Sequence, residues 1–259
     1  MRRLLFGILL FPMMTYAEPT GYSPTIDDVK SMYDNRRWST TSLGISGSGN
    51  NKLVAPTRNT LSMKHNSSWV YGYNDFDINI INPLQANYIF YGNYRPSLSL
   101  IRSSGTYANK YPMLDLALAS QFSWTELNER VFDLGFDLHL APPNTWHYLV
   151  IGAYARKNFN YTGGTYSIQL RGKVTIARSV IFKLTVDGTP KDQNPKPSQN
   201  QIALKANLMV RADLLLDVGR AWGRGDQVYL GPTFRYWANK LGRKGINESS
   251  YGIELLISL

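Results

Sequence analysis

Polar side chains suited to binding a solute alternate with apolar ones along much of the chain. The segment Asp-Phe-Asp-Ile-Asn-Ile at 75–80 shows the pattern, with polar residues at odd positions and apolar residues at even ones. Every second side chain of an extended strand points to the same face. Carboxylates, guanidinium groups and aromatic rings gathered on one face can hold a polar solute by hydrogen bonds, ion pairs and stacking. The candidates for this ligand-binding face are Asp75, Asp77, Arg95, Asp115, Asp133, Asp137, Arg171, Lys205, Arg211, Asp213, Tyr229, Arg235 and Trp237.

These charges are unevenly distributed along the sequence. The five aspartates from Asp75 to Asp137 precede most of the bases, which run from Arg171 to Arg235 with Asp213 and Asp217 among them. Two opposed walls of unlike charge would orient a dipolar solute between them. The alternative is that the charges pair with one another and fill the space. Tyr229 and Trp237 share a face with Arg235, which suits stacking on a flat solute, although packing near a rim explains them equally well.

Catalytic groupings are poor in this sequence. It has no cysteine and three histidines, His65, His139 and His147. A serine–histidine arrangement needs a third group to orient the imidazole, and only His139 with Asp137 offers one. No histidine–glutamate cluster has the spacing of a metal site. We therefore expect no catalytic residue, no cofactor and no metal.

The longest alternation runs from Gln201 to Val218. All nine residues at every second position from Ile202 are apolar, and the intervening set carries the charges Lys205, Arg211, Asp213 and Asp217. In a soluble sandwich the apolar face would point inward. In an outer-membrane barrel it would point outward to lipid, with the polar face lining the lumen. This strand by itself does not choose between the two.

The N-terminus predicts export. Arg2 and Arg3 precede an apolar run from Leu4 to Met14, and small residues allow cleavage after Ala17, which makes 1–17 a signal peptide. The run is shorter than the roughly 20 residues of a membrane-spanning helix. Residues 18–37 are interpreted as a periplasmic leader. The net charge, which falls from +10 to +8 without Arg2 and Arg3, then suits lipopolysaccharide or an anionic solute rather than nucleic acid.

Twelve alternating segments follow the leader, and the last alternates up to Leu259. An even count and a last strand able to pair with the first predict a closed barrel. The fold class is therefore all-β, a 12-stranded antiparallel up-and-down transmembrane barrel over residues 38–259. The expected segments are 38–46, 60–69, 75–80, 89–101, 113–124, 131–140, 146–156, 165–176, 180–187, 201–218, 227–239 and 251–259.

Aromatic residues near the segment ends favour interfacial girdles, with an aromatic-rich sandwich as the alternative. They are Trp38, Trp69, Trp124, Trp146, Tyr166, Tyr236 and Tyr251. A twelve-stranded barrel is wider than the roughly eight strands that side chains fill and narrower than general porins. The size indicates a narrow, selective pore.

Four stretches along the chain form a recognisable series. They are TLSMKHNSSWVYG at 60–72 followed by DFD at 75–77, Tyr91-Gly92 with PSLSL at 96–100, FDLGFD at 132–137, and YWANKLG at 236–242 followed by NES at 247–249. In this order they resemble four stretches of the Tsx/OmpK-type nucleoside-specific channels of the Gram-negative outer membrane. The resemblance implies a monomeric twelve-stranded channel for nucleosides that also serves as a phage or colicin receptor.

The chain departs from the family pattern at three places. Lys64 stands where the family has an acid, Ser68 where it has glycine, and Leu259 where barrels prefer an aromatic residue. Lys64 would change the charge of the lumen if it faces inward. We expect a passive channel for nucleosides or similar small polar solutes. The alternatives are an outer-membrane lipolytic enzyme and a plugged barrel acting as an adhesin or phage receptor.

Overall fold

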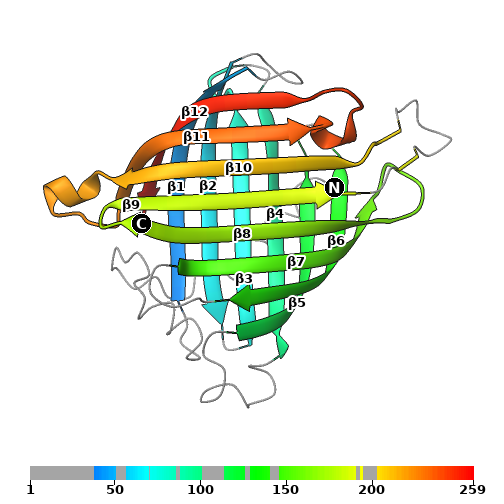
Figure 1. The fold of residues 1–259 in the computed structure, drawn as a ribbon, viewed down its shortest axis with the longest axis horizontal. Helices are drawn as coiled ribbons and strands as arrows, with labels where there is room; N and C mark the ends of the chain where they lie inside the picture. The colour runs from blue at the N-terminus through cyan, green and yellow to red at the C-terminus, as the bar shows by residue number, and fades with distance from the viewer. Residues whose placement is uncertain are drawn as a thin grey trace, which may run out of the picture.

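The chain folds into a closed barrel of twelve antiparallel strands (Figure 1), which confirms the predicted fold class. The computed structural model describes residues 38–50, 57–69, 71–85, 88–100, 114–125, 129–140, 146–190, 193–194 and 203–259, so the predicted signal peptide and leader lie outside it. The strands are β1 Trp38–Gly49, β2 Arg58–Trp69, β3 Gly72–Ile81, β4 Ile89–Ser99, β5 Leu114–Trp124, β6 Arg130–Leu140, β7 Trp146–Asn158, β8 Thr165–Ala177, β9 Val180–Thr189, β10 Asn207–Asp217, β11 Val228–Ala238 and β12 Glu248–Ser258.

The first and last strands close the barrel. β1 pairs with β12 from Ser42↔Ser258 to Gly49↔Tyr251, and the Leu259 amide donates to the Thr41 carbonyl at 2.8 Å. Closure satisfies the backbone groups that a sheet edge would expose, which is what a lipid environment requires. We call the rim where β1 begins and β12 ends the terminal rim, and the opposite one the loop rim.

The strands are strongly tilted around the barrel. In Figure 1 the strands of the near wall, β8 to β12, run across those of the far wall, β1 to β4. Tilt of this kind is the geometric condition for closing a sheet into a barrel. Two short 3₁₀ turns flank β11, with η2 at Gly219–Trp222 on the terminal rim and η3 at Lys240–Gly242 on the loop rim.

The polarity of the wall is inverted, as the sequence predicted. Large apolar side chains such as Ile253, 63% exposed, and Ile168, 53% exposed, cover the outside. The buried residues of the same strands are mostly polar or charged and point inward: Ser62, Asn79, Arg95, Ser97, Ser99, Asp115, Gln121, Asp133, Asp137, Ser167, Gln169, Asp213, Ser250 and Glu254. Strand β7, whose orientation the sequence left open, turns Ile151 outward and buries Val150 and Tyr154 inside.

Exposed aromatic residues lie near both rims. Tyr166, Tyr236 and Tyr251 mark the loop rim, and Trp69 with Tyr71 marks the terminal rim. These positions match the girdles expected where a barrel meets the two membrane interfaces. The side chains of Trp38 and Trp146 lie outside the described set.

The stretch Gln201–Val218 does not form one long strand, as the sequence had suggested. β10 covers only Asn207–Asp217, because β9 ends opposite Asn207, at Thr189. Upstream, Leu204 forms an isolated bridge with Gln193, and the Lys205 amide donates to the Gly242 carbonyl at 2.8 Å. The alternation continues past the end of the partner strand, so it overstates the length of the membrane strand.

An outward residue in the middle of a strand should be sensitive to charge. We expect Leu134→Arg in β6 to lower the free energy of unfolding in lipid vesicles by about 2–4 kcal/mol, because a guanidinium at mid-bilayer depth is poorly solvated. Leu134→Met, which keeps the surface apolar, should cost far less. Denaturant titration in vesicles measures both, and equal values for the two variants would contradict a lipid-facing outer wall.

Candidate functional site

The lumen near the terminal rim is lined by two different groups of side chains. On β9 to β12, Ile181, Leu215, Tyr229 and Leu256 form a buried apolar cluster. On β3 to β6, Asp115 is fully buried and accepts hydrogen bonds from Tyr73 Oη and Ser99 Oγ, each at 2.7 Å. His139 stacks on the Tyr73 ring with centroids 4.7 Å apart. The side chains of each group therefore contact one another.

The middle of the lumen holds a network of charged and amide side chains from β3 to β8. Arg95 donates through Nε to Gln121 Oε1 at 3.0 Å and through Nη2 to Gln169. Its Nη1 lies 4.0 Å from Asp137 Oδ2, and its guanidinium carbon lies 5.4 Å from the Tyr154 ring centre. We call Asp75, Arg95, Gln121, Asp137, Tyr154, Gln169 and Arg171 the mid-barrel network.

Arg171 carries this network across the lumen. From β8 its Nη1 reaches Asp75 Oδ2 on β3 at 3.0 Å, and its Nη2 lies 3.4 Å from Asp137 Oδ2 on β6. Strands β3 and β8 are five positions apart in the ring of twelve, on nearly opposite sides. We call this contact the Arg171 chord. It crosses the lumen next to β4 to β7 and does not occupy the other side, along β9 to β12, β1 and β2.

Charges of opposite sign form ion pairs along the wall of the lumen. Arg156 on β7 binds Asp133 on β6 at 2.7 and 3.1 Å. Arg211 on β10 binds Asp213 at 2.8 Å and Glu254 on β12 at 2.5 Å. Buried ions are stable only when paired in this way. The sequence-based picture of an acidic wall facing a basic wall is thus replaced by its alternative, in which the charges pair.

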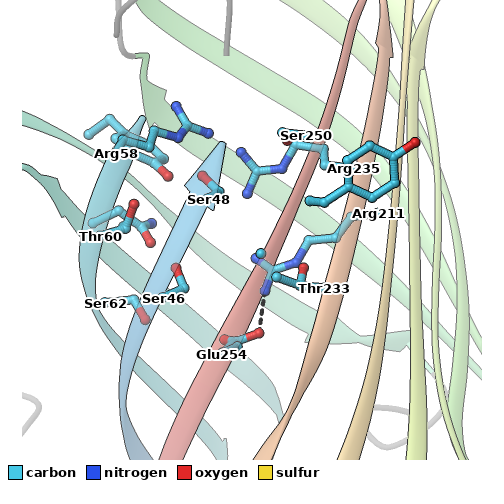
Figure 2. A pocket seen from close by; sticks show the side chains of 14 residues that line it. Ser46, Ser48, Arg58, Thr60, Ser62, Arg211, Thr233, Arg235, Ser250 and Glu254 are labelled. Carbon is cyan, nitrogen blue, oxygen red and sulfur yellow. Dashed lines mark hydrogen bonds and ion pairs between the residues drawn. The ribbon is translucent and has the colours of Figure 1, made fainter. Parts of the chain in front are cut away.

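A polar recess opens into the lumen toward the loop rim (Figure 2). We call this space the lumen recess. Strands β1 to β4 supply one side of it and β10 to β12 the other. Its lining is rich in hydroxyls and arginine and consists of Ser46, Ser48, Arg58, Thr60, Ser62, Asn79, Tyr91, Arg211, Thr233, Arg235, Ser250, Tyr251, Gly252 and Glu254.

Loop residues meet above the lumen at the loop rim. Glu129, just before β6, accepts from Arg243 after η3 at 3.2 Å, from Asn158 at 3.2 Å and from Tyr161 at 3.3 Å. β6 and β12 lie opposite each other in the ring, so the Glu129–Arg243 pair joins two sides of the rim. Burial raises the pKa of the Glu129 carboxyl, although Arg243 and the two hydrogen bonds act to lower it.

The structure places the predicted site residues in different surroundings, and not all of them line the lumen. Lys205 lies before β10 and not within it, and its amide donates to the Gly242 carbonyl. Tyr229 is also not placed for stacking on a solute, since its ring is buried in the apolar cluster. Trp237 lies near the loop rim with Lys240 Nζ 5.4 Å from its ring centre. The remaining candidates face the lumen, and Arg211 and Arg235 line the recess. Ligand binding by any of them stays a prediction.

Sequence reasoning missed Arg58, Tyr91 and Glu254 in the recess. Arg58 was missed because the second segment was expected to begin at Thr60, whereas β2 begins two residues earlier. Extending the alternation by one step would have placed Arg58 on the lumen face. Lys64 does face inward, with its β3 neighbour Asp77 opposite.

Two kinds of feature are absent from the part of the chain that the structure describes. Within it, no group of three or more His, Asp or Glu side chains could hold a metal ion. No helix in that part is long and apolar enough to cross a membrane.

Known proteins resemble the chain in structure but not in sequence. No protein-family model matches it, and neither does any curated protein. The KdgM porin superposes with a TM-score of 0.51 at 5% identity, covering 84% of this chain and 99% of the porin. The NanC porin gives 0.55 at 12% identity, covering 84% and 100%. An outer membrane channel from Pseudomonas putida F1 gives 0.52 at 9% identity, covering 85% and 95%.

The chain thus has the fold of outer-membrane porin-like channels. The likeness concerns the barrel alone, since identities this low carry no information on solutes. Membership of the Tsx/OmpK family is not confirmed by these comparisons and stays a prediction.

The raised pKa of Glu129 predicts a pH-dependent contact at the loop rim. The ion pair with Arg243 exists only while Glu129 is ionised, so it is lost as the pH falls through the raised pKa. We expect a spin label at Lys244→Cys, in a chain that has no other cysteine, to become more mobile as the pH falls. The midpoint of this change should lie above the ordinary glutamate pKa of about 4.3.

Two variants sharpen this measurement. Glu129→Gln should make the label mobile at every pH, because no ion pair forms. A label at Ala221→Cys, exposed in η2 on the terminal rim, should not respond. A label at position 244 that ignores both pH and Glu129→Gln would refute the contact.

Proposed function

We propose that the protein is a passive outer-membrane channel for small polar solutes. The observation that carries this proposal is the combination of an apolar outer wall with a lumen lined by charges and a polar recess. An apolar exterior suits the hydrocarbon core, and a polar interior suits water and solutes. The terminal rim, where β1 begins and β12 ends, then faces the periplasm. One chain closes the barrel by itself, in keeping with a monomer.

The lumen contents favour a narrow path. The mid-barrel network occupies the side next to β4 to β7, so a solute would pass along β9 to β12, β1 and β2. The side chains there, including Lys64, Lys183 and Asp213, are polar and partly charged. A path of this kind admits small solutes by size and selects them by hydrogen bonding and charge.

Nucleosides or solutes of similar size are the proposed cargo. The sequence resemblance to nucleoside channels supports them, and the recess offers the Tyr91 ring with several hydroxyls. Stacking on an aromatic ring and hydrogen bonds to sugar hydroxyls would hold a nucleoside. We expect transport to follow the concentration gradient, without coupling to an energy source.

A lipolytic function has less support from the histidines. His65 shares a hydrogen bond with Thr41 Oγ1 at 2.9 Å, and His147 with Thr175 Oγ1 at 2.6 Å. His139 lies inside the barrel, stacked on Tyr73. None of these contacts is the serine–histidine pair that such an enzyme would present to lipid.

Reconstitution tests the channel proposal. Purified protein in planar bilayers should show discrete conductance steps, and added adenosine or uridine should reduce the current by occupying the path. Liposome swelling should be faster with nucleosides than with a disaccharide. Absence of conductance in bilayers, together with no swelling in any solute, would refute a channel.

Arg171 should control both the conductance and the charge selectivity. Arg171→Ala removes the chord and leaves Asp75 and Asp137 without that cation, so we expect a higher conductance and a shift toward cations in the reversal potential. Arg156→Ala removes the same charge from a contact with the neighbouring strand and should change conductance much less. A larger effect from Arg156→Ala would contradict the assigned path.

A further inference from the structure

We infer that Lys173 and Lys183 form a binding site for an oxyanion, the phosphate or carboxylate group of a solute in the lumen. We call these two side chains the lysine pair. The inference rests on the proposed channel function and specifies the chemistry of its solute. It narrows the cargo from neutral nucleosides to small anions of the same size, such as nucleoside monophosphates and sugar phosphates.

The register between β8 and β9 sets two like charges against each other. Lys173 and Lys183 are direct partners across these strands. Both point into the lumen, because Lys173 follows Arg171 by two residues and Lys183 follows the buried lumen residue Ile181 by two. The side chains of such partners start about 5 Å apart, and two like charges in this position destabilise a sheet.

The lysine pair departs from the pairing of charges in the rest of the lumen. Arg156, Arg171 and Arg211 each bind a carboxylate at 2.5 to 3.0 Å. In the part of the chain that the structure describes, neither Lys173 nor Lys183 forms a hydrogen bond or an ion pair. Two ammonium groups therefore share one part of the lumen without a bonded carboxylate.

The acids beside Lys183 are bonded to another base. Asp213 is its direct partner on β10, but this carboxylate accepts from Arg211 at 2.8 Å and from Thr233 at 2.6 Å. Glu254, whose charge also acts on Lys183, binds the same arginine at 2.5 Å. Of these two negative charges one compensates Arg211, and the other attracts Lys183 over a distance longer than an ion pair.

The acid that acts on Lys173 is Asp226, at the terminal rim. Its carboxylate accepts from Tyr229 Oη at 3.1 Å, lies 3.8 Å from Arg220 Nη2, and belongs to a side chain that is 39% exposed. Water and salt screen a carboxylate in such a position. The charge of Lys173 is therefore compensated only in part.

Lys64 adds positive charge from the other wall. It lies on β2, six positions from β8 in the ring of twelve, and its charge repels that of Lys183. Its direct partner on β3 is Asp77, which accepts a hydrogen bond from Asn79 at 3.0 Å. Lys64 thus raises the potential at the lysine pair, but it has an acid beside it on its own wall.

Apolar neighbours strengthen the field of the lysine pair. Ile181 lies on the same face as Lys183 and belongs to the buried cluster near the terminal rim. Charges interact more strongly beside apolar side chains than in bulk water. An oxyanion between the two ammonium groups would offset their repulsion and accept hydrogen bonds from both, since each ammonium has three donors. A neutral nucleoside lacks the charge that this arrangement requires.

Titration calorimetry of the refolded full chain in detergent tests the inference with matched ligands. We expect AMP to bind at least about tenfold more tightly than adenosine, because hydrogen bonds to a charged group add about 1.5–3 kcal/mol. Glucose 6-phosphate and gluconate, each compared with glucose, show whether phosphate or carboxylate is the preferred oxyanion. Equal affinities of the native chain for AMP and adenosine would overturn the proposal.

Single substitutions assign the preference to the lysine pair. Lys173→Gln and Lys183→Gln should each weaken AMP binding by about tenfold and leave adenosine binding unchanged. Lys64→Gln removes the same charge from the other wall and should weaken AMP binding much less. Lys244→Gln, at an exposed position of the loop rim, should have no effect. AMP binding that both variants of the pair retain, or that Lys64→Gln lowers as strongly, would refute the site.

Stability provides a second readout. Because like charges face each other, Lys173→Gln should raise the midpoint of thermal unfolding without ligand. Potassium phosphate, compared with potassium chloride of equal ionic strength, should raise the midpoint of the native chain more than that of Lys173→Gln. Equal shifts in the two proteins would contradict a phosphate site at the pair.

These measurements separate the lysine pair from the channel proposal, because neither depends on conduction. They also use the native chain, so the comparison of AMP with adenosine decides the matter even if a glutamine variant does not fold. A chain that conducts but binds AMP no better than adenosine refutes the lysine pair alone. A chain that binds AMP at the pair without conducting refutes the channel.

Discussion

The hydrogen-bond ladder between β1 and β12 is the constraint on which the rest of the structure depends. An unpaired backbone amide or carbonyl in hydrocarbon costs several kcal/mol, so an open sheet of these strands would not be stable in a membrane. Closure removes both edges at once and gives the wall an inside and an outside. Every inward residue then shares one enclosed space with residues from strands far away in sequence, which is how Asp75 on β3 comes within 3.0 Å of Arg171 on β8.

That enclosed space determines how the charges behave. On an open surface these carboxylates and guanidinium groups would be solvated singly, whereas inside the barrel each needs a partner of opposite sign. Asp133 with Arg156, and Glu254 with Arg211, show pairing between adjacent or nearby strands. The Arg171 chord shows pairing across the lumen. Because the Arg171 chord and the mid-barrel network lie beside β4 to β8, the remaining space is off-centre, and the recess lies on the other side.

The recess shows the same pairing of charges. Its carboxylate Glu254 and the adjacent Asp213 bind Arg211. The hydroxyls, arginines and the Tyr91 ring of the lining give the proposed channel polar groups for a solute. The loop-rim contact between Glu129 and Arg243 lies above the same lumen.

The sequence determined the fold and the polarity of the wall. Alternation with a period of two is a local property, so the twelve segments were recovered with end errors of a few residues, the largest at 201–206. The same period predicted which residues face the lumen. The exception is β7, because both of its faces carry apolar residues. The sequence placed Lys205 within a strand, whereas β10 begins at Asn207, because alternation does not reveal where a partner strand ends.

Only the tertiary structure decided how the inward residues are paired. Sequence order separates Asp75 from Arg171 by 96 residues, and the register and tilt that bring them together arise from the closure of the whole ring. The same closure brings Arg58 on β2 and Arg235 on β11 into one recess. It also buries Tyr229 among apolar neighbours, whereas the sequence predicted that Tyr229 would meet a solute. The period along each strand fixes which face a side chain takes, whereas its neighbours across the lumen depend on all twelve strands together.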